Sequence, residues 1–162
     1  MLIKLKNKDT LIVDDFKFKC SIGKNGININ KKEGDNCTPK GKFKIETIYY
    51  RADKVKKPIT KIKIKKIKKN MLWCNDPYSK DYNKQIYVNK KNKGEKIYRN
   101  DYKYDYFIVI EYNTKKIKPN IGSAIFLHLT KNYQKTAGCI AINKKDFLIM
   151  LKIINKNSII II

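Results

Sequence analysis

The residues best suited to covalent chemistry are one histidine and one of four cysteines. His128, the only histidine among 162 residues, lies eleven positions before Cys139, and Gly138 directly precedes that cysteine. A thiol is a strong nucleophile only as the thiolate, and a neighbouring imidazole is the commonest base that produces one near neutral pH. The pair therefore indicates a cysteine enzyme. A core histidine beside a buried free thiol is the alternative that the same spacing allows.

An acyl-transfer site also needs donors for the charge that develops on the carbonyl oxygen. Glycine lets the backbone approach a substrate closely, so we expect the N–H groups of Gly138 and Cys139 to form the oxyanion hole. Ala137 leaves room on the approach. Because the chain has no second histidine, any imidazole-based mechanism must use His128.

Strand patterns dominate the segments that must position these residues. Continuous apolar runs predict central strands at 106–112 and 124–129, and period-two alternation predicts half-buried strands at 16–22 and 62–67. Asn143 is a good N-cap, and the apolar spacing after it predicts one helix directly after the Cys139 segment. Further short strands are expected at 2–5, 11–13, 43–50 and 159–162.

The length and these patterns predict one mostly-β domain over residues 1–162. Residues 73–104 are rich in Tyr, Asn and Lys and show little periodicity. We interpret them as a long irregular insertion that covers a site.

The segments around the histidine and the cysteine resemble a known catalytic motif. Residues 122–128 and Thr136-Ala-Gly-Cys139 are similar to the motif of the L,D-transpeptidase (YkuD-type) domain, above all in the subfamily grouped with the ErfK, YbiS, YcfS and YnhG proteins. The resemblance covers about residues 16–152. Further landmarks follow in the order of that subfamily: Lys32-Glu-Gly-Asp35, Thr38-Pro-Lys-Gly-Lys-Phe43, Tyr50-Arg-Ala-Asp53, Trp73-Cys-Asn-Asp-Pro77, Tyr82-Asn83 and Glu111-Tyr-Asn113.

The resemblance implies a YkuD-like β-sandwich or barrel that acts on peptidoglycan stem peptides. Cys139 would attack the carbonyl of the third residue of a tetrapeptide stem and release D-Ala, with His128 as the base. The acyl group would then pass to an amine of a second stem, which gives a cross-link. Two alternatives stay open: an L,D-carboxypeptidase or other amide hydrolase with the same dyad, and a basic module that binds nucleic acid or wall polymer without catalysis.

Two further residues are candidates for substrate binding. Thr136 keeps the small hydroxyl of the motif, and Arg51 could hold a stem-peptide carboxylate in a bidentate manner. A loop cap for Thr136 and an ion pair of Arg51 with Asp53 are the structural alternatives. The sequence also departs from the broader family: Ala137 replaces its usual histidine, the spacing from histidine to cysteine is shorter, and Ile140 and its neighbours replace the usual Arg or Asn.

The net charge of +24 comes from 38 basic and 14 acidic residues. Arg, which phosphate and base-edge recognition prefers, occurs only at Arg51 and Arg99, and the lysines are spread along the chain. The charge therefore favours a solvated basic surface that attracts anionic surfaces, with no specific nucleic-acid partner.

Cysteine spacing indicates no metal and no cofactor. Cys20, Cys37, Cys74 and Cys139 include no CxxC pair, and no histidine stands at zinc spacing. No segment is long and apolar enough for a membrane span, and no signal peptide is visible. The resemblance implies the periplasm or cell envelope, whereas the N-terminal residues leave a cytoplasmic location open.

Overall fold

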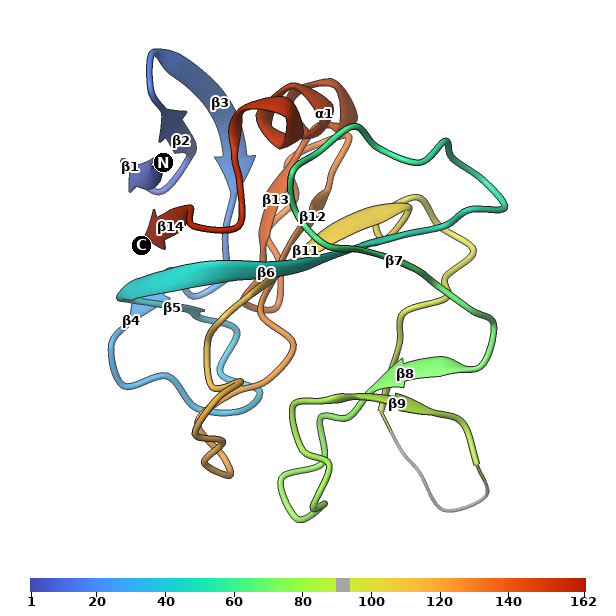
Figure 1. The fold of residues 1–162 in the computed structure, drawn as a ribbon. Helices are drawn as coiled ribbons and strands as arrows, with labels where there is room; N and C mark the ends of the chain where they lie inside the picture. The colour runs from blue at the N-terminus through green and yellow to red at the C-terminus, as the bar shows by residue number, and fades with distance from the viewer. Residues whose placement is uncertain (90–93) are drawn as a thin grey trace.

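The computed structural model describes residues 1–89 and 94–162, and a nine-stranded sheet forms its framework (Figure 1). The strand order is β11-β12-β13-β3-β2-β1-β14-β6-β7, and β6 also pairs with β11, which closes the first eight strands into a ring. The strands are β1 (Leu2–Lys6), β2 (Thr10–Val13), β3 (Phe16–Ser21), β6 (Lys42–Tyr50), β7 (Ile64–Lys66), β11 (Tyr106–Ile110), β12 (Phe126–Leu129), β13 (Ile140–Ile142) and β14 (Ile159–Ile161).

The expectation of a mostly-β fold with one helix is confirmed. The helix α1 (Lys144–Ile153) begins after Asn143, whose side-chain oxygen accepts the N–H of Asp146 at 2.9 Å. Its buried face consists of Phe147, Met150 and Leu151, as the apolar spacing predicts. Within the described residues, no helix has the length and apolar character that crossing a membrane requires.

The insertion at 73–104 is less irregular than the sequence predicts. Together with the residues just before it, it forms a three-stranded sheet of order β10-β8-β9, made of β8 (Met71–Trp73), β9 (Gln85–Tyr87) and β10 (Glu95–Lys96). Strands of two or three residues are too short to show a period of two, so only their tertiary pairing reveals them. Residues 90–93 of the insertion lie outside the described residues. A further short pair joins β4 (Ile27–Asn28) to β5 (Thr38–Pro39).

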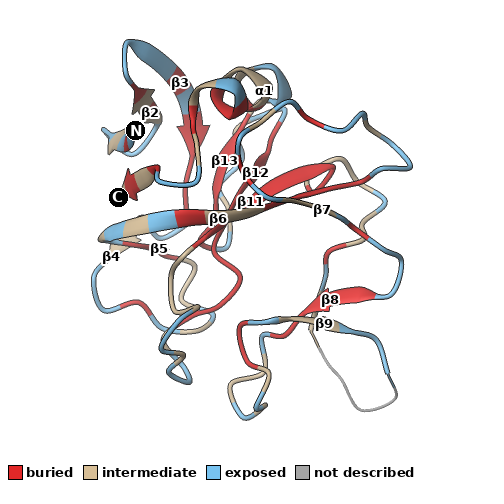
Figure 2. Cartoon of the chain, viewed as in Figure 1, coloured by how far each residue is buried: buried red, intermediate tan, exposed pale blue. Residues whose placement is uncertain are grey.

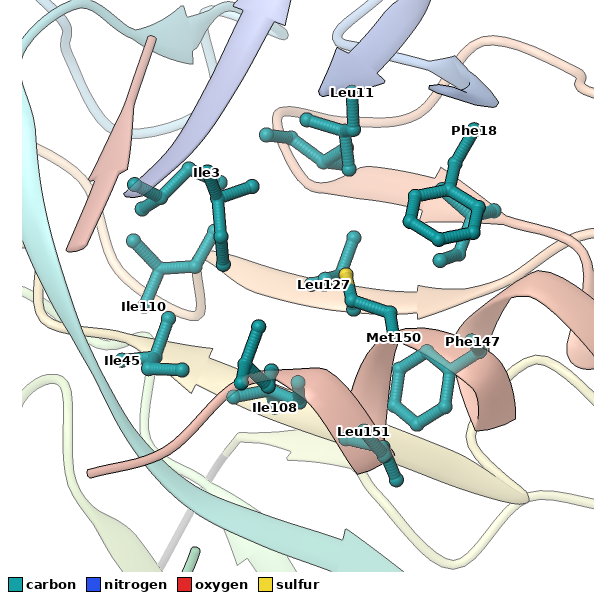
Figure 3. Packing of buried hydrophobic residues seen from close by; sticks show 14 of the residues in the cluster. Ile3, Leu11, Phe18, Ile45, Ile108, Ile110, Leu127, Phe147, Met150 and Leu151 are labelled. Carbon is teal, nitrogen blue, oxygen red and sulfur yellow. The ribbon is translucent and has the colours of Figure 1, made fainter. Parts of the chain in front are cut away.

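Two hydrophobic clusters lie on opposite faces of the β11–β12 wall. Leu127 and Ile108 belong to the larger cluster, which α1 completes with Phe147 and Met150 (Figure 3). Alternate residues of the same strands, among them Phe107 and Phe126, pack with Trp73 and Tyr104 of the insertion. Burial is accordingly concentrated in the central strands and in β8 (Figure 2). The second face, between the wall and the insertion, is where the candidate catalytic residues lie.

Candidate active site

Strand register brings the predicted nucleophile and base together. β12 and β13 are parallel neighbours with Leu127 opposite Ile140 and His128 opposite Ala141. Side chains alternate between the faces of a strand, so His128 and Cys139 project on the same face, opposite to that of Leu127. Although they are eleven residues apart in sequence, His128 and Cys139 therefore lie diagonally opposite each other across the β12–β13 pair.

A cavity of about 420 Å³ opens on this face. Both His128 and Cys139 line it, together with the loop that connects β12 to β13 and the second half of the insertion. The insertion thus lines the site, as we expected. The titratable side chains in the wall, apart from the two just named, are Lys31, Glu33, Glu95, Arg99, Tyr102, Lys103, Tyr104 and Lys135.

The Cys139 thiol is held by backbone groups of the neighbouring segment. Its Sγ donates to the carbonyl of Ala124 at 3.1 Å and accepts the N–H of Phe126 at 3.3 Å. Burial raises the pKa of Cys139 to about 12, and the charge of Glu95 adds to the rise. The Cys139 thiol is therefore neutral and points toward a carbonyl.

His128 is held as a neutral base. Its Nδ1 lies 2.9 Å from the carbonyl oxygen of Leu129, which can only accept, so Nδ1 carries the proton and Nε2 keeps a lone pair. Burial lowers the pKa of His128 to about 4. The ring of Tyr104 packs against the imidazole at 5.4 Å between centroids, in an edge-on arrangement. The imidazole thus has the tautomer that a general base for the thiol needs.

The loop before the nucleophile is fixed by Thr136. Its hydroxyl donates to the carbonyl of Cys139 at 2.6 Å and accepts the N–H of Gly138 at 3.1 Å. Thr136 lines the cavity, but its hydroxyl serves the loop, which is the geometry of the loop-cap alternative. The Gly138 N–H, predicted as an oxyanion donor, is likewise engaged in this resting state.

Gly138 also meets a steric requirement that the sequence does not reveal. Its φ is +141°, and a Cβ there would lie 2.7 Å from the carbonyl oxygen of Cys37. Only glycine tolerates this combination without a shift of the backbone. The backbone at Gly138 therefore lies close to the 31–38 loop of the protein itself.

Asn83 holds the residue whose carbonyl accepts the Cys139 thiol. Its Oδ1 accepts the N–H of Ala124 at 2.9 Å and the indole N–H of Trp73 at 2.9 Å. Its Nδ2 donates to the carbonyls of Tyr112 and Asn113. Ala124 itself has a φ of +52°, a conformation that alanine seldom adopts. One buried amide thus connects the insertion to the segment that holds the Cys139 thiol.

A hydrogen-bonded acid and phenol form another part of the wall. The Tyr104 hydroxyl donates to Glu95, and the guanidinium of Arg99 lies 5.1 Å from the centre of the Tyr104 ring. Burial raises the pKa of Glu95 and raises that of Tyr104 well above its usual range. Both side chains come from the segment without periodicity, so the sequence offers no signal for them.

Arg51 lies outside the residues that line the cavity. It makes a bidentate pair with Asp53 at 2.8 and 2.7 Å, donates to the carbonyl of Arg99, and lies 3.5 Å over the ring centre of Tyr98. This is the geometry of the ion-pair alternative. Trp73 is similarly a buried packing residue in contact with Phe126.

The other three cysteines do not line the cavity. All four thiols are free and buried, and Cys20 belongs to the larger core cluster, as its alternation with phenylalanines predicts. Across residues 1–89 and 94–162, no group of three or more His, Cys, Asp or Glu side chains is placed to hold a metal ion.

Comparison with known protein families decides the identity of this fold. The family described as YkuD, L,D-transpeptidase catalytic domain, matches residues 2–162, which is almost the whole chain. The chain belongs to the YkuD family. A comparison with curated proteins found no match. The YkuD assignment is the one that the sequence motif predicts, and its placement in the ErfK, YbiS, YcfS and YnhG subfamily stays a prediction.

Sequence reasoning missed several residues of this YkuD site. Asn83 stands in the Tyr82-Asn83 landmark, so the motif pointed to this residue but did not indicate its function. Lys31 directly precedes the Lys32–Asp35 landmark, yet it is Lys31 that is buried and pairs with Asp35.

Proposed function

We propose that this YkuD domain is a peptidoglycan L,D-transpeptidase that works through a Cys139 thioester. The observation that carries the proposal is the β12–β13 register, which directs a neutral thiol and a neutral imidazole into one cavity of a family member. The family acts on peptidoglycan, so the donor is a tetrapeptide stem, and the place of action is the cell envelope.

In the first half-reaction, Nε2 of His128 takes the thiol proton while the sulfur of Cys139 bonds to the carbonyl carbon of the third stem residue. The negative charge on the carbonyl oxygen is met near the Gly138 and Cys139 backbone. Collapse of this intermediate breaks the amide C–N bond, and the imidazolium protonates the departing D-Ala amine. A thioester remains on Cys139.

In the second half-reaction, an amine of another stem attacks the thioester carbonyl. His128 takes a proton from this amine, the C–S bond breaks, and the thiolate is protonated again. Water in place of the amine gives a shortened stem and makes the enzyme an L,D-carboxypeptidase. The basic surface, with its net charge of +24, favours contact with anionic envelope polymers.

Intact-mass measurement after incubation with a tetrapeptide muropeptide tests the proposal. We expect a covalent adduct on the wild-type protein, no adduct on Cys139→Ala, and an adduct on the control Cys20→Ala, which removes a thiol on the opposite face of the sheet. Cross-linked dimers identify transfer, and a tripeptide alone identifies hydrolysis. Processing of the peptide by Cys139→Ala at the wild-type rate would refute the mechanism.

A further inference from the structure

A buried lysine stands in the cavity wall beside the nucleophile loop. Lys31 is only 5% exposed and lines the same cavity as Cys139 and His128. Lysine is almost never buried unless it is paired, because its ammonium is strongly hydrated. The acyl transfer described above assigns no part to this charge.

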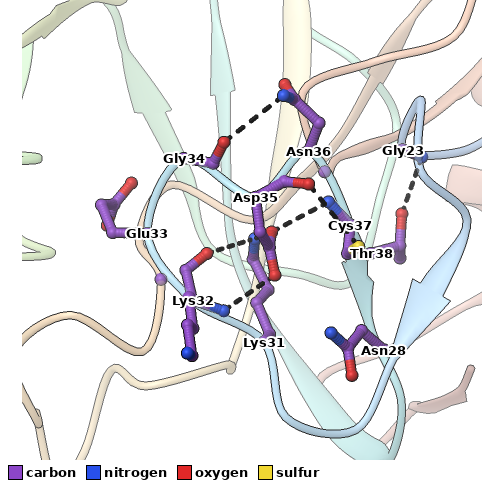
Figure 4. Close-up of polar contacts among 12 residues, drawn as sticks. Gly23, Asn28, Lys31, Lys32, Glu33, Gly34, Asp35, Asn36, Cys37 and Thr38 are labelled. Carbon is purple, nitrogen blue, oxygen red and sulfur yellow. Dashed lines mark hydrogen bonds and ion pairs between the residues drawn. The ribbon is translucent and has the colours of Figure 1, made fainter.

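Asp35 and the backbone fix the position of the ammonium (Figure 4). Nζ of Lys31 donates to Oδ1 of Asp35 at 2.6 Å and to the carbonyl of Lys32 at 3.3 Å. The Asp35 carboxylate is itself held by the N–H groups of Lys32 and Cys37, at 2.8 and 2.9 Å. An ammonium has three N–H donors, so one donor remains beyond these two bonds within the described residues.

Two glycines mark the course of the Lys31 side chain. A Cβ on Gly122 would lie 2.8 Å from Cε of Lys31, so the stem passes directly over that backbone. A Cβ on Gly138 would lie 3.4 Å from Nζ, so the charged end reaches the residue just before Cys139. The Gly138 N–H, which we expected to bind the oxyanion, is already bound to Thr136. The Lys31 ammonium therefore lies next to a backbone donor that is occupied.

The charge of Lys31 acts on the nucleophile as well. Burial and the charge of Glu95 raise the pKa of Cys139, and the charge of Lys31 offsets a part of this rise. A buried positive charge that is already held in place is effective because little reorganisation is needed as negative charge develops.

We propose that Lys31 is a catalytic residue whose ammonium stabilises the negative charge at the reaction centre, first on the Cys139 sulfur and then on the attacked carbonyl oxygen. The second part rests on the proposed acyl transfer, whereas the first part does not. A purely structural Lys31–Asp35 ion pair is the competing explanation.

Alkylation by iodoacetamide, mapped peptide by peptide, separates the two explanations. A structural role predicts that Lys31→Met loosens the loop and speeds alkylation of Cys139. The electrostatic role predicts the opposite sign: the rate at Cys139, taken relative to the buried thiol Cys20 in the same sample, falls roughly threefold or more, because loss of the cation raises the pKa of Cys139 further. The control Asp35→Asn breaks the ion pair but keeps the cation, so its ratio should not fall.

Turnover of the tetrapeptide muropeptide tests the second part. We expect Lys31→Met to lower kcat about tenfold to a hundredfold with little change in KM, because the charge appears only along the reaction path. If Lys31→Met does not fold, Lys31→Gln takes its place with the same expected signs. An unchanged or increased Cys139-to-Cys20 ratio overturns the proposal. A muropeptide that no variant processes refutes the proposed function, while the alkylation ratio still decides the role of Lys31.

Discussion

Cys139 and His128 are both held in their uncharged forms, because burial disfavours a charge on either group. The pKa of the thiol rises to about 12 and that of the imidazole falls to about 4. An ion pair is therefore not the resting state of this dyad. In the proposed reaction, proton transfer from Cys139 to His128 would therefore accompany the attack on a carbonyl, and the negative charge that develops on the carbonyl oxygen would balance the positive charge on the imidazolium.

Alkylation of Cys139 should reflect this neutral resting state. We expect the rate in the free, folded protein to be slow at pH 7 and to keep rising above pH 9, because the thiolate fraction grows until the pH reaches the raised pKa. Peptide mapping after timed exposure to iodoacetamide, with the unfolded protein as control, measures this. A plateau of the rate below pH 8 would show instead that the thiol is already activated.

His128 should make folding stability depend on pH. Its pKa is lower in the folded protein than the ordinary 6.5, so the folded state binds fewer protons, and the stabilisation is present above pH 6.5 and is lost as the pH falls toward 4. The pKa difference corresponds to roughly 3 kcal/mol. Between pH 7 and pH 4.5, the free energy of unfolding measured in urea should fall more for the wild type than for His128→Gln. Equal losses would contradict a buried neutral imidazole.

At the scale of elements, Asn83 joins three segments that are distant in sequence. It bonds Trp73 in β8, the turn at Tyr112 and Asn113, and Ala124, whose carbonyl accepts the thiol of Cys139. All four hydrogen-bonding positions of the amide are used. The insertion is thereby attached to the sheet at the point where the Cys139 thiol is held.

Asn83→Ala should destabilise the protein strongly. Several buried polar groups lose their partner, at about 1–3 kcal/mol for each unsatisfied group, so we expect a total of several kcal/mol. The free energy of unfolding in urea measures this.

Asn143→Ala is the matched control for the loss of Asn83. Asn143 does not line the cavity; its replacement removes the N-cap of α1 and the bonds of its amide to Tyr133 and Asp146, and should cost only about 1–2 kcal/mol. If Asn83→Ala and Asn143→Ala lowered the free energy of unfolding by similar amounts, the Asn83 bonds would not be a principal link between the insertion and the sheet.

At the scale of the whole molecule, the excess of 38 basic over 14 acidic residues produces self-repulsion. The described ion pairs, such as Lys31–Asp35 and Arg99–Asp101, leave most lysines without an acidic partner because acids are so few. Salt screens such repulsion over a Debye length of about 8 Å at physiological ionic strength.

Thermal stability should therefore increase with salt. We expect Tm to rise by several degrees between roughly 20 and 200 mM NaCl, since screening relieves repulsion in the compact state more than in the unfolded chain. Scanning calorimetry measures the shift. Potassium chloride, as a second simple salt, should give the same rise; a Tm that is unchanged or lower in both salts would contradict dominant repulsion.

The strand and helix patterns were readable because they reflect local periodicity. The alternation in residues 16–22, the apolar runs of β11 and β12, and the cap at Asn143 each identify an element without knowledge of its partners. The ring closure of β6 on β11 and the small sheet of β8, β9 and β10 depend on pairing between distant residues, which no local pattern encodes.

For the site, the sequence by itself determined which residues are the candidate nucleophile and base, because one histidine and one Gly-Cys pair stand in a motif that resembles the family's. Only the tertiary structure decided their ionisation, their tautomer and their surroundings. Burial of Cys139 and His128 fixes the neutral forms, Lys31 and Glu95 reach the cavity from two separate segments, and Asn83 bonds the residue whose carbonyl accepts the Cys139 thiol. Charge, solvent exposure and hydrogen bonding depend on what lies nearby in space, and that proximity arises only when the chain folds.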